Sequence, residues 1–157
     1  MPHLKKQCVC RVFPLMIALP ALMLSCGPRH EGSEEQLLAT ADSFATAYYN
    51  WHFWDCARHC TDSSQIWLQY AASNVRQADI DLLNAQGEGA GHKITDISYG
   101  QDGASATVSV SVSHFLQMDT IGTAAHLVEE ATFELPMRRT DRGWQVNLRS
   151  LPKGKKE

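Results

Sequence analysis

The sequence predicts an α+β domain in which N-terminal helices pack on a curved, four-stranded antiparallel meander. Apolar residues in the first half recur at steps of three and four, which is the spacing of one face of an α-helix. After residue 91 apolar and polar residues alternate, as they do in strands with one buried face. Three glycines in residues 86–91 separate the two halves, because glycine is costly inside a helix. Helices followed by strands are typical of a two-layer α+β fold.

The first predicted helix begins near Glu34. Ser33 and Gln36 have the spacing of a capping box, in which the hydroxyl accepts a bond from a free backbone N–H and the amide reaches back to the cap. Six apolar residues repeat along one face of this helix: Leu37, Leu38, Ala41, Phe44, Ala45 and Tyr48. The pattern loses phase at residues 50–52, and propensity leaves open whether the chain breaks or bends there.

Two further helices are expected before the glycine-rich segment. A short helix at residues 53–60 turns four small or apolar residues inward: Phe53, Cys56, Ala57 and Cys60. A long helix at residues 64–84, bent near Ser73, has an apolar face of Trp67, Tyr70, Ala71, Val75, Ala78 and Leu82. Both faces need a covering layer, and the predicted sheet supplies it.

Four strands are predicted, at residues 92–99, 104–116, 125–138 and 144–149, with turns at residues 101–103 and 139–143. The second strand has a dry face of Ala106, Val108, Val110 and Val112. Its wet face carries Ser105, Thr107, Ser109, Ser111 and Ser113. The third strand is expected to turn Leu127, Ala131, Phe133, Leu135 and Met137 to one side. One apolar face therefore runs across the sheet.

Composition is that of a single globular domain. The chain has 157 residues, a length too short for two typical domains. Of these residues, 44% are hydrophobic and 20% are charged, as is usual for a globular protein. We assign residues 34–150 to one α+β domain and residues 151–157 to a flexible charged tail.

Residues 1–25 have the parts of a secretory signal. Lys5, Lys6 and Arg11 precede an apolar run at residues 12–24, which is shorter than the roughly 20 residues that span a bilayer. The run ends in Leu22-Met23-Leu24-Ser25-Cys26-Gly27, which resembles a bacterial lipobox, although Met23 stands where Leu is usual. This resemblance implies that the Cys26 thiol receives a diacylglyceryl group and becomes the new N-terminus. An ordinary cleaved signal peptide is the alternative.

The sequence after cleavage is expected to lie outside the cytoplasm, in a bacterial cell envelope. Residues 26–33 would tether the domain to a lipid anchor in the membrane. Removing residues 1–25 leaves 11 Lys and Arg against 17 Asp and Glu, a formal charge of −6. Nucleic acid is therefore not expected as a partner. Inner membrane, outer membrane and surface exposure all remain open.

Several short motifs resemble those of one protein superfamily. They are Phe44-x-x-Ala47, Trp54-Asp55-x-Ala57, Thr61-Asp62-Ser63-Ser64, Ile94-x-x-Ile97-x-x-Gly100-x-Asp102-x-Ala104-x-Ala106-x-Val108 and Gly143-Trp144-x-Val146. Over residues 34–148 the chain resembles small lipoproteins of the nuclear-transport-factor-2-like (cystatin-like) superfamily, and is similar to the bacterial domain of unknown function once labelled lumazine-binding-like. The resemblance implies a cone-shaped domain and supports the fold better than an activity.

The cysteine and histidine residues near residue 56 suggest two kinds of site, a metal site and a disulfide. His52, Cys56, His59 and Cys60 share a face of a continuous helix, but one helix converges four tetrahedral ligands poorly, so we expect no metal. Cβ atoms four residues apart on a helix lie about 5–6 Å apart, beyond the roughly 3.5–4.5 Å of a disulfide. We expect Cys56 and Cys60 to pack as buried thiols, with a disulfide as the alternative.

Enzymes of the superfamily use an Asp or a His–Asp pair inside the cone as acid and base. Asp55, His114 and Glu130 are the polar candidates here, but none fits such a pattern, so no catalytic residue or cofactor is predicted. Tryptophans at 51, 54, 67 and 144 line a ligand cavity or fill the core. The prediction is a nonenzymatic, lipid-anchored protein that binds a small hydrophobic ligand or an envelope protein. A structural or homodimeric interaction module and an acid/base isomerase or dehydratase are the alternatives.

Overall fold

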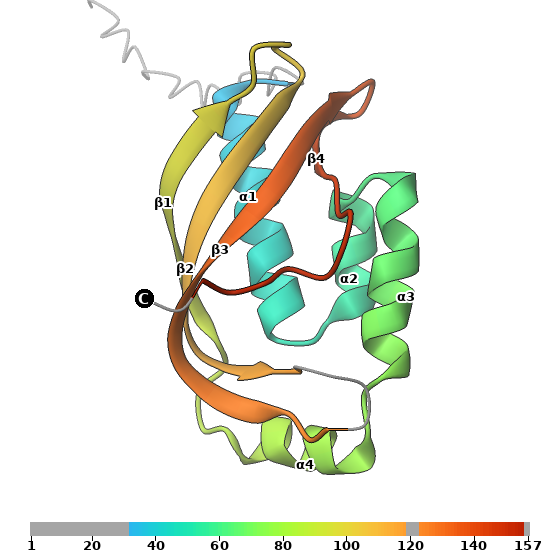
Figure 1. The fold of residues 1–157 in the computed structure, drawn as a ribbon, viewed down its shortest axis with the longest axis vertical. Helices are drawn as coiled ribbons and strands as arrows, with labels where there is room; N and C mark the ends of the chain where they lie inside the picture. The colour runs from blue at the N-terminus through green and yellow to red at the C-terminus, as the bar shows by residue number, and fades with distance from the viewer. Residues whose placement is uncertain (1–31, 119–122, 156–157) are drawn as a thin grey trace, which may run out of the picture.

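A computed structural model describes residues 32–118 and 123–155. The helices are α1 (Glu34–Tyr49), α2 (Phe53–Cys56), α3 (Gln65–Ser73) and α4 (Gln77–Ala85), with 3-10 turns at Ala57–His59 and Asp62–Ser64. The strands are β1 (Gly91–Tyr99), β2 (Ser105–Gln117), β3 (His126–Thr140) and β4 (Gly143–Val146). They form one antiparallel sheet in the order β1-β2-β3-β4, which confirms the predicted α+β meander (Figure 1).

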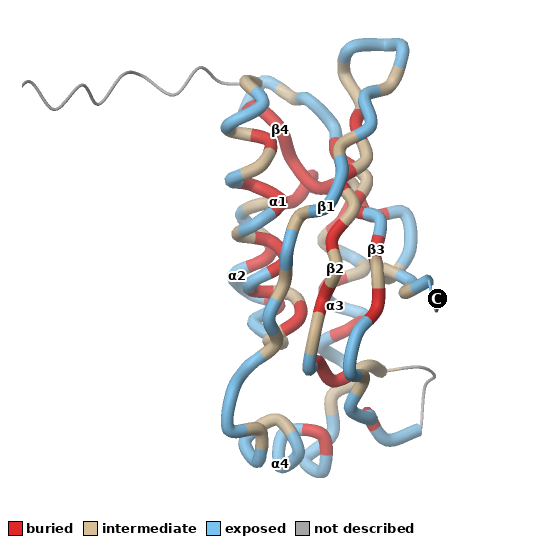
Figure 2. The backbone as a smooth tube through the Cα atoms, turned by 90° about the vertical axis from the view of Figure 1, so that its left-hand side faces the viewer, coloured by how far each residue is buried: buried red, intermediate tan, exposed pale blue. Residues whose placement is uncertain are grey.

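The core lies between α1 and the concave face of the sheet. Leu37, Ala41 and Phe44 on α1 are fully buried, as are the valines of the predicted dry face of β2. Figure 2 shows the buried positions of α1 and β4 turned toward each other, whereas α4 at the lower end is largely exposed. The helix period of α1 and the strand period of β2 therefore predicted the two main faces of the core correctly.

The N-terminus of α1 uses half of the predicted capping box. Ser33 Oγ accepts a hydrogen bond from Gln36 N at 3.1 Å. The Gln36 side chain does not return to the cap; its Oε1 accepts from Trp144 N at 2.6 Å and its Nε2 donates to Trp144 O at 3.1 Å. Because β4 lies beside this end of the helix, the glutamine fastens α1 to β4 instead.

The short second helix is briefer than predicted. It ends at Cys56, and residues Ala57–His59 continue as a 3-10 turn. Phe53, Cys56 and Cys60 are buried as expected, whereas Ala57 is half-buried.

The predicted long helix at residues 64–84 is wrong, because α3 and α4 are separate helices. Ser73 Oγ and Asn74 Nδ2 both donate to Tyr70 O at 2.8 Å, which competes with continuation of α3. The chain is extended at Arg76, and Asp79 Oδ2 accepts from Arg76 N at 3.0 Å to start α4. Figure 1 shows α4 turned across the lower end of the sheet.

The face predicted for that helix is also wrong at three of its six positions. Tyr70, Ala78 and Leu82 are exposed, whereas Ala71 is buried as predicted. Leu68 and Asp79, which were not on the predicted face, are buried too. The two helices turn in different directions, so a single periodic stripe through both cannot face one layer.

Two irregularities curve the sheet. The β1–β2 pairing shifts by one residue between Ile94 and Asp96, a β-bulge that turns both Ile94 and Ile97 toward the core. His114 in β2 has φ +53°, and the β2–β3 ladder omits its pairing with the residue opposite. The alternation changes phase there, so Phe115 and Leu116 are both buried.

The same change of phase explains why the prediction for one residue of β3 was wrong. Leu127, expected on the buried side, is 51% exposed. Its neighbour Val128 packs against the core instead.

The last strand and the tail also differ from expectation. β4 ends at Val146, short of the predicted end at residue 149. Gln145 is buried, and its side chain donates to Cys60 O at 3.0 Å. The chain then follows the free edge of β3, where Lys155 N donates to Thr132 O at 2.9 Å. Residues 151–155, expected to be a flexible tail, lie against this edge because it offers unpaired backbone groups.

The predicted signal segment (residues 1–25), the lipid-attachment residue Cys26 and most of the tether lie outside the described residues. Over the ranges 32–118 and 123–155, no helix combines the length and apolar character needed to cross a membrane.

Candidate functional site: an aromatic pocket at the end of the core

A small pocket opens where the C-terminus of α1 and the start of α2 meet the lower parts of β2 and β3. Its cavity volume is about 50 Å³, and it is partly open to solvent. Six aromatic rings line it: Tyr48, Tyr49, Trp51, Phe53, Phe115 and Phe133. We call it the aromatic pocket.

The corner between α1 and α2 positions the first side of the aromatic pocket. α1 ends after two successive tyrosines, and Asn50 then bonds the loop before β1 through Ala90 N at 2.9 Å. Trp51 has φ +62°, a left-handed conformation that is uncommon for a bulky residue and costs energy. Its indole Nε1 donates to Leu116 O at 3.2 Å, which fixes the ring at the rim.

The opposite side depends on the irregularity at His114. Its left-handed backbone lets Phe115 and Leu116, which are adjacent in sequence, both turn inward and line the pocket. Gln86 Nε2 donates to His114 O at 3.2 Å, so the loop after α4 supports this conformation. Two left-handed residues, Trp51 and His114, thus flank one pocket.

The rings are packed in edge-to-face and tilted contacts. The Tyr49 ring centroid lies 4.8 Å from that of Phe133 and 5.8 Å from that of Phe115. Phe115 and Phe133 contact each other edge to face at 5.4 Å. Such contacts stabilise each pair beyond simple burial.

The Tyr49 hydroxyl is unusual because it is a buried polar group without a hydrogen-bond partner in the described part of the protein. The residue as a whole is 4% exposed. Burial raises the pKa of Tyr49, with a smaller effect from Tyr48, so the phenol stays neutral and able to donate. A buried hydroxyl without a partner costs about 1–3 kcal/mol.

The segment after β4 forms the third side of the aromatic pocket. Leu151 and Pro152 line it. Gly154 lies so close to Phe133 that an added Cβ would meet the ring at 3.2 Å. Lys155 holds this segment in place through its backbone bond to Thr132 and an ion pair with Glu134.

Only one of the four tryptophans predicted for a cavity lines this one. Trp51 is at its rim, whereas Trp54 is 90% exposed. Trp67 is half-buried against the ring of Tyr70. Trp144 is buried in the core, where its Nε1 donates to Gly32 O at 3.0 Å. Sequence spacing did not reveal Tyr49, Phe115 or Phe133 as pocket residues. For Phe115 the reason is the phase change at His114, which has no local signature.

The three acid/base candidates lie elsewhere. Asp55 is exposed and pairs with Arg58 at 2.9 Å. His114 is exposed beside Glu129 at 3.3 Å, and Glu130 accepts from Ser111 Oγ at 2.6 Å. None of the three lines the aromatic pocket.

The two cysteines are free and buried. Burial raises the pKa of Cys60 to about 12 and that of Cys56 further, with the neighbouring thiol as a second cause at Cys56. Cys56 Sγ donates to His52 O at 3.5 Å. In the part of the chain that is described, no three His, Cys, Asp or Glu side chains, those of His52 and His59 included, are arranged to hold a metal ion.

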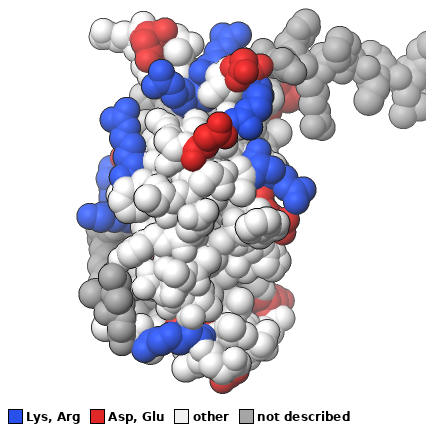
Figure 3. All heavy atoms as spheres, turned by 90° about the vertical axis from the view of Figure 1, so that its right-hand side faces the viewer, with Lys and Arg blue, Asp and Glu red and all other residues white. Residues whose placement is uncertain are grey.

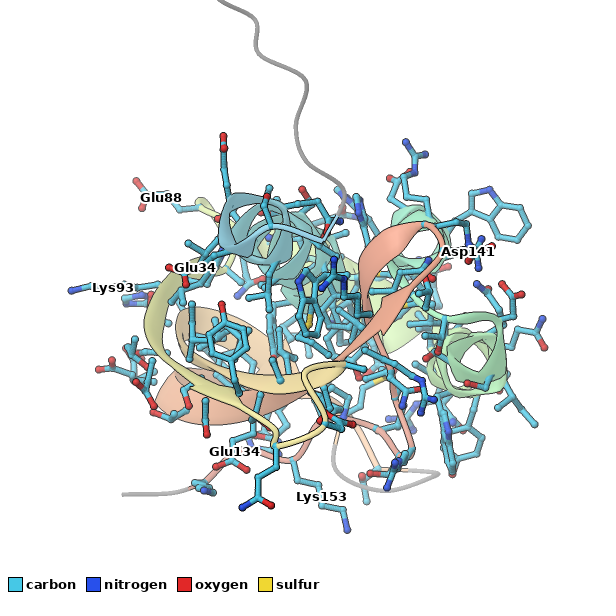
Figure 4. All side chains as sticks on the ribbon, turned by 90° about the horizontal axis from the view of Figure 1, so that it is seen from above. Glu34, Glu88, Lys93, Glu134, Asp141 and Lys153 are labelled. Atoms are coloured by element: carbon cyan, nitrogen blue, oxygen red, sulfur yellow. The ribbon has the colours of Figure 1, made fainter. Side chains whose placement is uncertain are left out.

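The polar face of β2 is on the outside of the sheet, as predicted. Ser105, Ser109, Ser111 and Ser113 are half-buried there, and Ser105 Oγ donates to Asp102 at 2.7 Å. Figure 4 shows from above that Glu88, Lys93, Glu134 and Lys153 point outward, away from the core.

Comparisons with known proteins add little beyond this geometry. No family model matches the chain, and no curated protein matches it. A solved structure described as "Ntf2 like protein involved in plasmid conjugation" is similar, with 17% sequence identity and a TM-score of 0.34. The match covers 79% of this chain and 49% of the other, so this chain spans about half the length of that protein.

Proposed function

We propose that this chain is a lipid-anchored protein of the bacterial cell envelope whose α+β domain binds a small apolar ligand in the aromatic pocket. We further propose that it belongs to the nuclear-transport-factor-2-like superfamily, a proposal supported by the order of its elements, helices followed by a four-stranded meander, and by the sequence motifs. Acylation of Cys26 would tether the domain through residues 26–33.

The observation that carries this proposal is the buried, unpartnered hydroxyl of Tyr49. A polar atom left without a partner lowers stability, and phenylalanine at this position would avoid the cost. The strained backbone of Trp51 adds a second cost at the same pocket. Unfavourable features that gather at one cavity favour a binding role, in which a ligand supplies the missing contact.

The pocket limits the size and chemistry of the ligand group. A single water needs about 10–15 Å³ of such volume, so a cavity of about 50 Å³ holds a group of a few heavy atoms. The walls are mostly aromatic and aliphatic, and they include Tyr49, whose hydroxyl is buried without a partner in the described part of the chain. We infer a planar or short apolar group with one hydrogen-bond acceptor, whose remainder extends through the open side.

Phenol is a suitable probe, because it combines an aromatic ring with one oxygen that can accept from Tyr49. We expect phenol to shift the backbone NMR signals of Trp51, Phe115 and Leu116 in a saturable way. Replacing Tyr49 with Phe should weaken binding about five- to tenfold, the effect of one buried hydrogen bond. Trp54→Phe, which changes a ring outside the pocket, is the matched control.

Signal changes spread over the surface, or equal affinity in Tyr49→Phe, would contradict this assignment. Native mass spectrometry of the protein isolated from its own cells gives an independent test. A co-purifying small molecule that is lost from Tyr49→Phe supports the proposal.

A second candidate is self-association through a surface on α2 and α3. Trp54 is 90% and Ile66 66% exposed, and Tyr70 lies one turn further along α3. α3 contains no charged residue, and Figure 3 shows the centre of this face free of Lys, Arg, Asp and Glu. A two-fold dimer places the same patch on both sides, so a patch without charge avoids like-charge repulsion.

Analytical ultracentrifugation tests this second candidate. We expect a dimer at micromolar concentration that the double variant Trp54→Ser, Ile66→Ser converts to a monomer. Leu127→Ser, which alters an exposed apolar residue on β3, is the control. A wild-type protein that stays monomeric throughout this concentration range would exclude this dimer.

A further inference from the structure

A polar groove of about 390 Å³ lies on the sheet, separate from the aromatic pocket. Its polar lining includes Asp102 in the turn between β1 and β2. It also includes residues of the upper parts of β1, β2 and β3 and of the segment after β4: Ser98, Ser105, Thr107, Arg138, Asn147 and Arg149. We call it the Arg138 groove. Its volume is within the range of about 300–1,000 Å³ that is usual for small-molecule sites.

The pairing register places no acidic residue directly opposite Arg138 on either neighbouring strand. Its partner in β2 is Ser105 and its partner in β4 is Gln145, so both directly opposed side chains are neutral. Two other arginines form ion pairs: Arg142 with Asp62 at 2.8 Å and Arg58 with Asp55 at 2.9 Å. Among residues 32–118 and 123–155, neither Arg138 nor Arg149 has an ion-pair partner.

The only acidic residue of the groove is already engaged. Asp102 Oδ1 accepts hydrogen bonds from Ser105 Oγ at 2.7 Å, Ser105 N at 2.9 Å and Ala104 N at 3.0 Å. These bonds, that from the Ser105 hydroxyl first, lower the pKa of Asp102, so it stays ionised within its own turn. Two guanidinium groups and one carboxylate leave the groove with a net positive charge.

Asn147 adds a directed donor. Its Oδ1 accepts from Thr61 Oγ1 at 3.0 Å and from Ser63 Oγ at 3.4 Å. Because the oxygen faces the loop at residues 61–63, the Nδ2 group is left to donate elsewhere. It has no acceptor in the described part of the chain. The side chain thus lines the groove as a donor beside Arg138.

We propose that the Arg138 groove binds an anionic sugar, with the carboxylate or phosphate of the ligand held by Arg138 and Arg149. A guanidinium presents a planar fork that matches such oxyanions in a bidentate way. The Asn147 amide and the hydroxyls of Ser98 and Thr107 offer hydrogen bonds to the hydroxyl groups of the ring. The predicted mature chain carries a formal −6 charge, so long-range attraction does not assist an anion and direct contacts must provide the affinity.

The test uses the full protein isolated in detergent, with glucose 6-phosphate and glucuronate as probes and neutral glucose as the comparison, followed by isothermal titration calorimetry. We expect at least one anionic sugar to bind about tenfold or more tightly than glucose. The preferred probe identifies the group as phosphate or carboxylate. Arg138→Gln and Arg149→Gln should each weaken binding about tenfold.

Two controls separate this site from other effects. Arg58→Gln removes an exposed arginine outside the groove and should leave the affinity unchanged. Tyr49→Phe alters the aromatic pocket alone and should also have no effect, so this proposal stands or fails independently of the proposed function. Equal binding of glucose and both anionic sugars, or wild-type affinity in Arg138→Gln, would overturn it.

Discussion

Tyr49 and Trp51 are two residues apart, and each keeps a locally unfavourable feature. Tyr49 has a buried hydroxyl without a partner, and Trp51 has a left-handed backbone. The backbone of Trp51 ends α1 in a Schellman motif, in which His52 N donates to Ala47 O at 2.8 Å and Trp51 N to Tyr48 O at 3.1 Å. The Tyr49 hydroxyl has no such structural role, because it makes no hydrogen bond in the described part of the chain. At the scale of single residues, this hydroxyl is better explained by a binding pocket than by stability.

We therefore predict that Tyr49→Phe stabilises the free protein. Removing a buried hydroxyl that has no partner should raise the free energy of unfolding by about 1 kcal/mol, since the ring contacts with Phe115 and Phe133 are kept. Urea denaturation followed by circular dichroism measures this difference. A loss of stability would mean that the hydroxyl already has a partner in the free protein.

A second residue-scale prediction concerns the thiols of Cys56 and Cys60. With a pKa of about 12 for Cys60, only about one thiol in ten thousand is ionised at pH 8, and Cys56 is ionised still less. We expect the two thiols to react with Ellman's reagent only after unfolding in urea. Rapid labelling of the native protein would contradict their burial, and the absence of labelling in urea would indicate a disulfide.

At the scale of elements, Asp79 joins α4 to the start of β3. It is 1% exposed, and its Oδ1 accepts from Ala125 N at 2.8 Å while Oδ2 accepts from Arg76 N at 3.0 Å. The bond from Ala125 is the largest cause of its lowered pKa, and burial acts in the opposite direction. The carboxylate thus caps one helix and fixes the loop that leads into a strand.

This link predicts a pH dependence. Because the pKa of Asp79 is lower in the folded protein than in the unfolded chain, its contribution to stability is complete above about pH 4 and disappears as the pH falls through the folded value. Asp79→Asn should lower the free energy of unfolding by about 1–3 kcal/mol at pH 7. It should also lose less stability than the wild type between pH 4 and pH 2.

Thermal unfolding of both proteins at several pH values measures the effect. Asp81→Asn, an exposed acid on the same helix, is the control. Parallel pH curves for wild type and Asp79→Asn would show that Asp79 does not carry this dependence.

The elements that sequence patterns predicted best are those whose faces are decided locally. α1 and the valine row of β2 follow their own periods, so their buried sides were predictable. The division of α3 from α4 was not, because it depends on bonds from Ser73 and Asn74 to Tyr70 O and on the distant contact between Asp79 and Ala125. Gln36 likewise binds Trp144 from 108 positions away, which no local capping rule includes.

At the scale of the whole molecule, the layer order was predictable and the site was not. Helices first and strands afterwards determine a two-layer domain, and the antiparallel order β1-β2-β3-β4 agrees with it. The aromatic pocket requires four separate chain segments and the phase change at His114. The segment at residues 151–155 closes one side of the pocket through contacts with β3. These contacts were not predicted, because the charged composition of the segment indicated a flexible tail.

The proposed anchor is tested by cell fractionation. Cys26→Ser removes the thiol that would be acylated, so we expect the protein to move from the membrane fraction to the soluble fraction. Mass spectrometry of the wild-type N-terminal peptide should show fatty acyl chains on Cys26. Unchanged membrane association of Cys26→Ser would refute the lipid anchor without affecting the aromatic pocket.

The most direct test of a ligand-binding domain is a thermodynamic cycle with phenol and benzene on the wild type and Tyr49→Phe. The two molecules differ by one hydroxyl, and so do the two proteins. Calorimetric titration should show that phenol loses about five- to tenfold in affinity when Tyr49 is replaced, whereas benzene binds equally well or better. Equal losses of affinity for phenol and benzene, or no binding of either, would contradict a pocket in which the Tyr49 hydroxyl donates a hydrogen bond to the ligand.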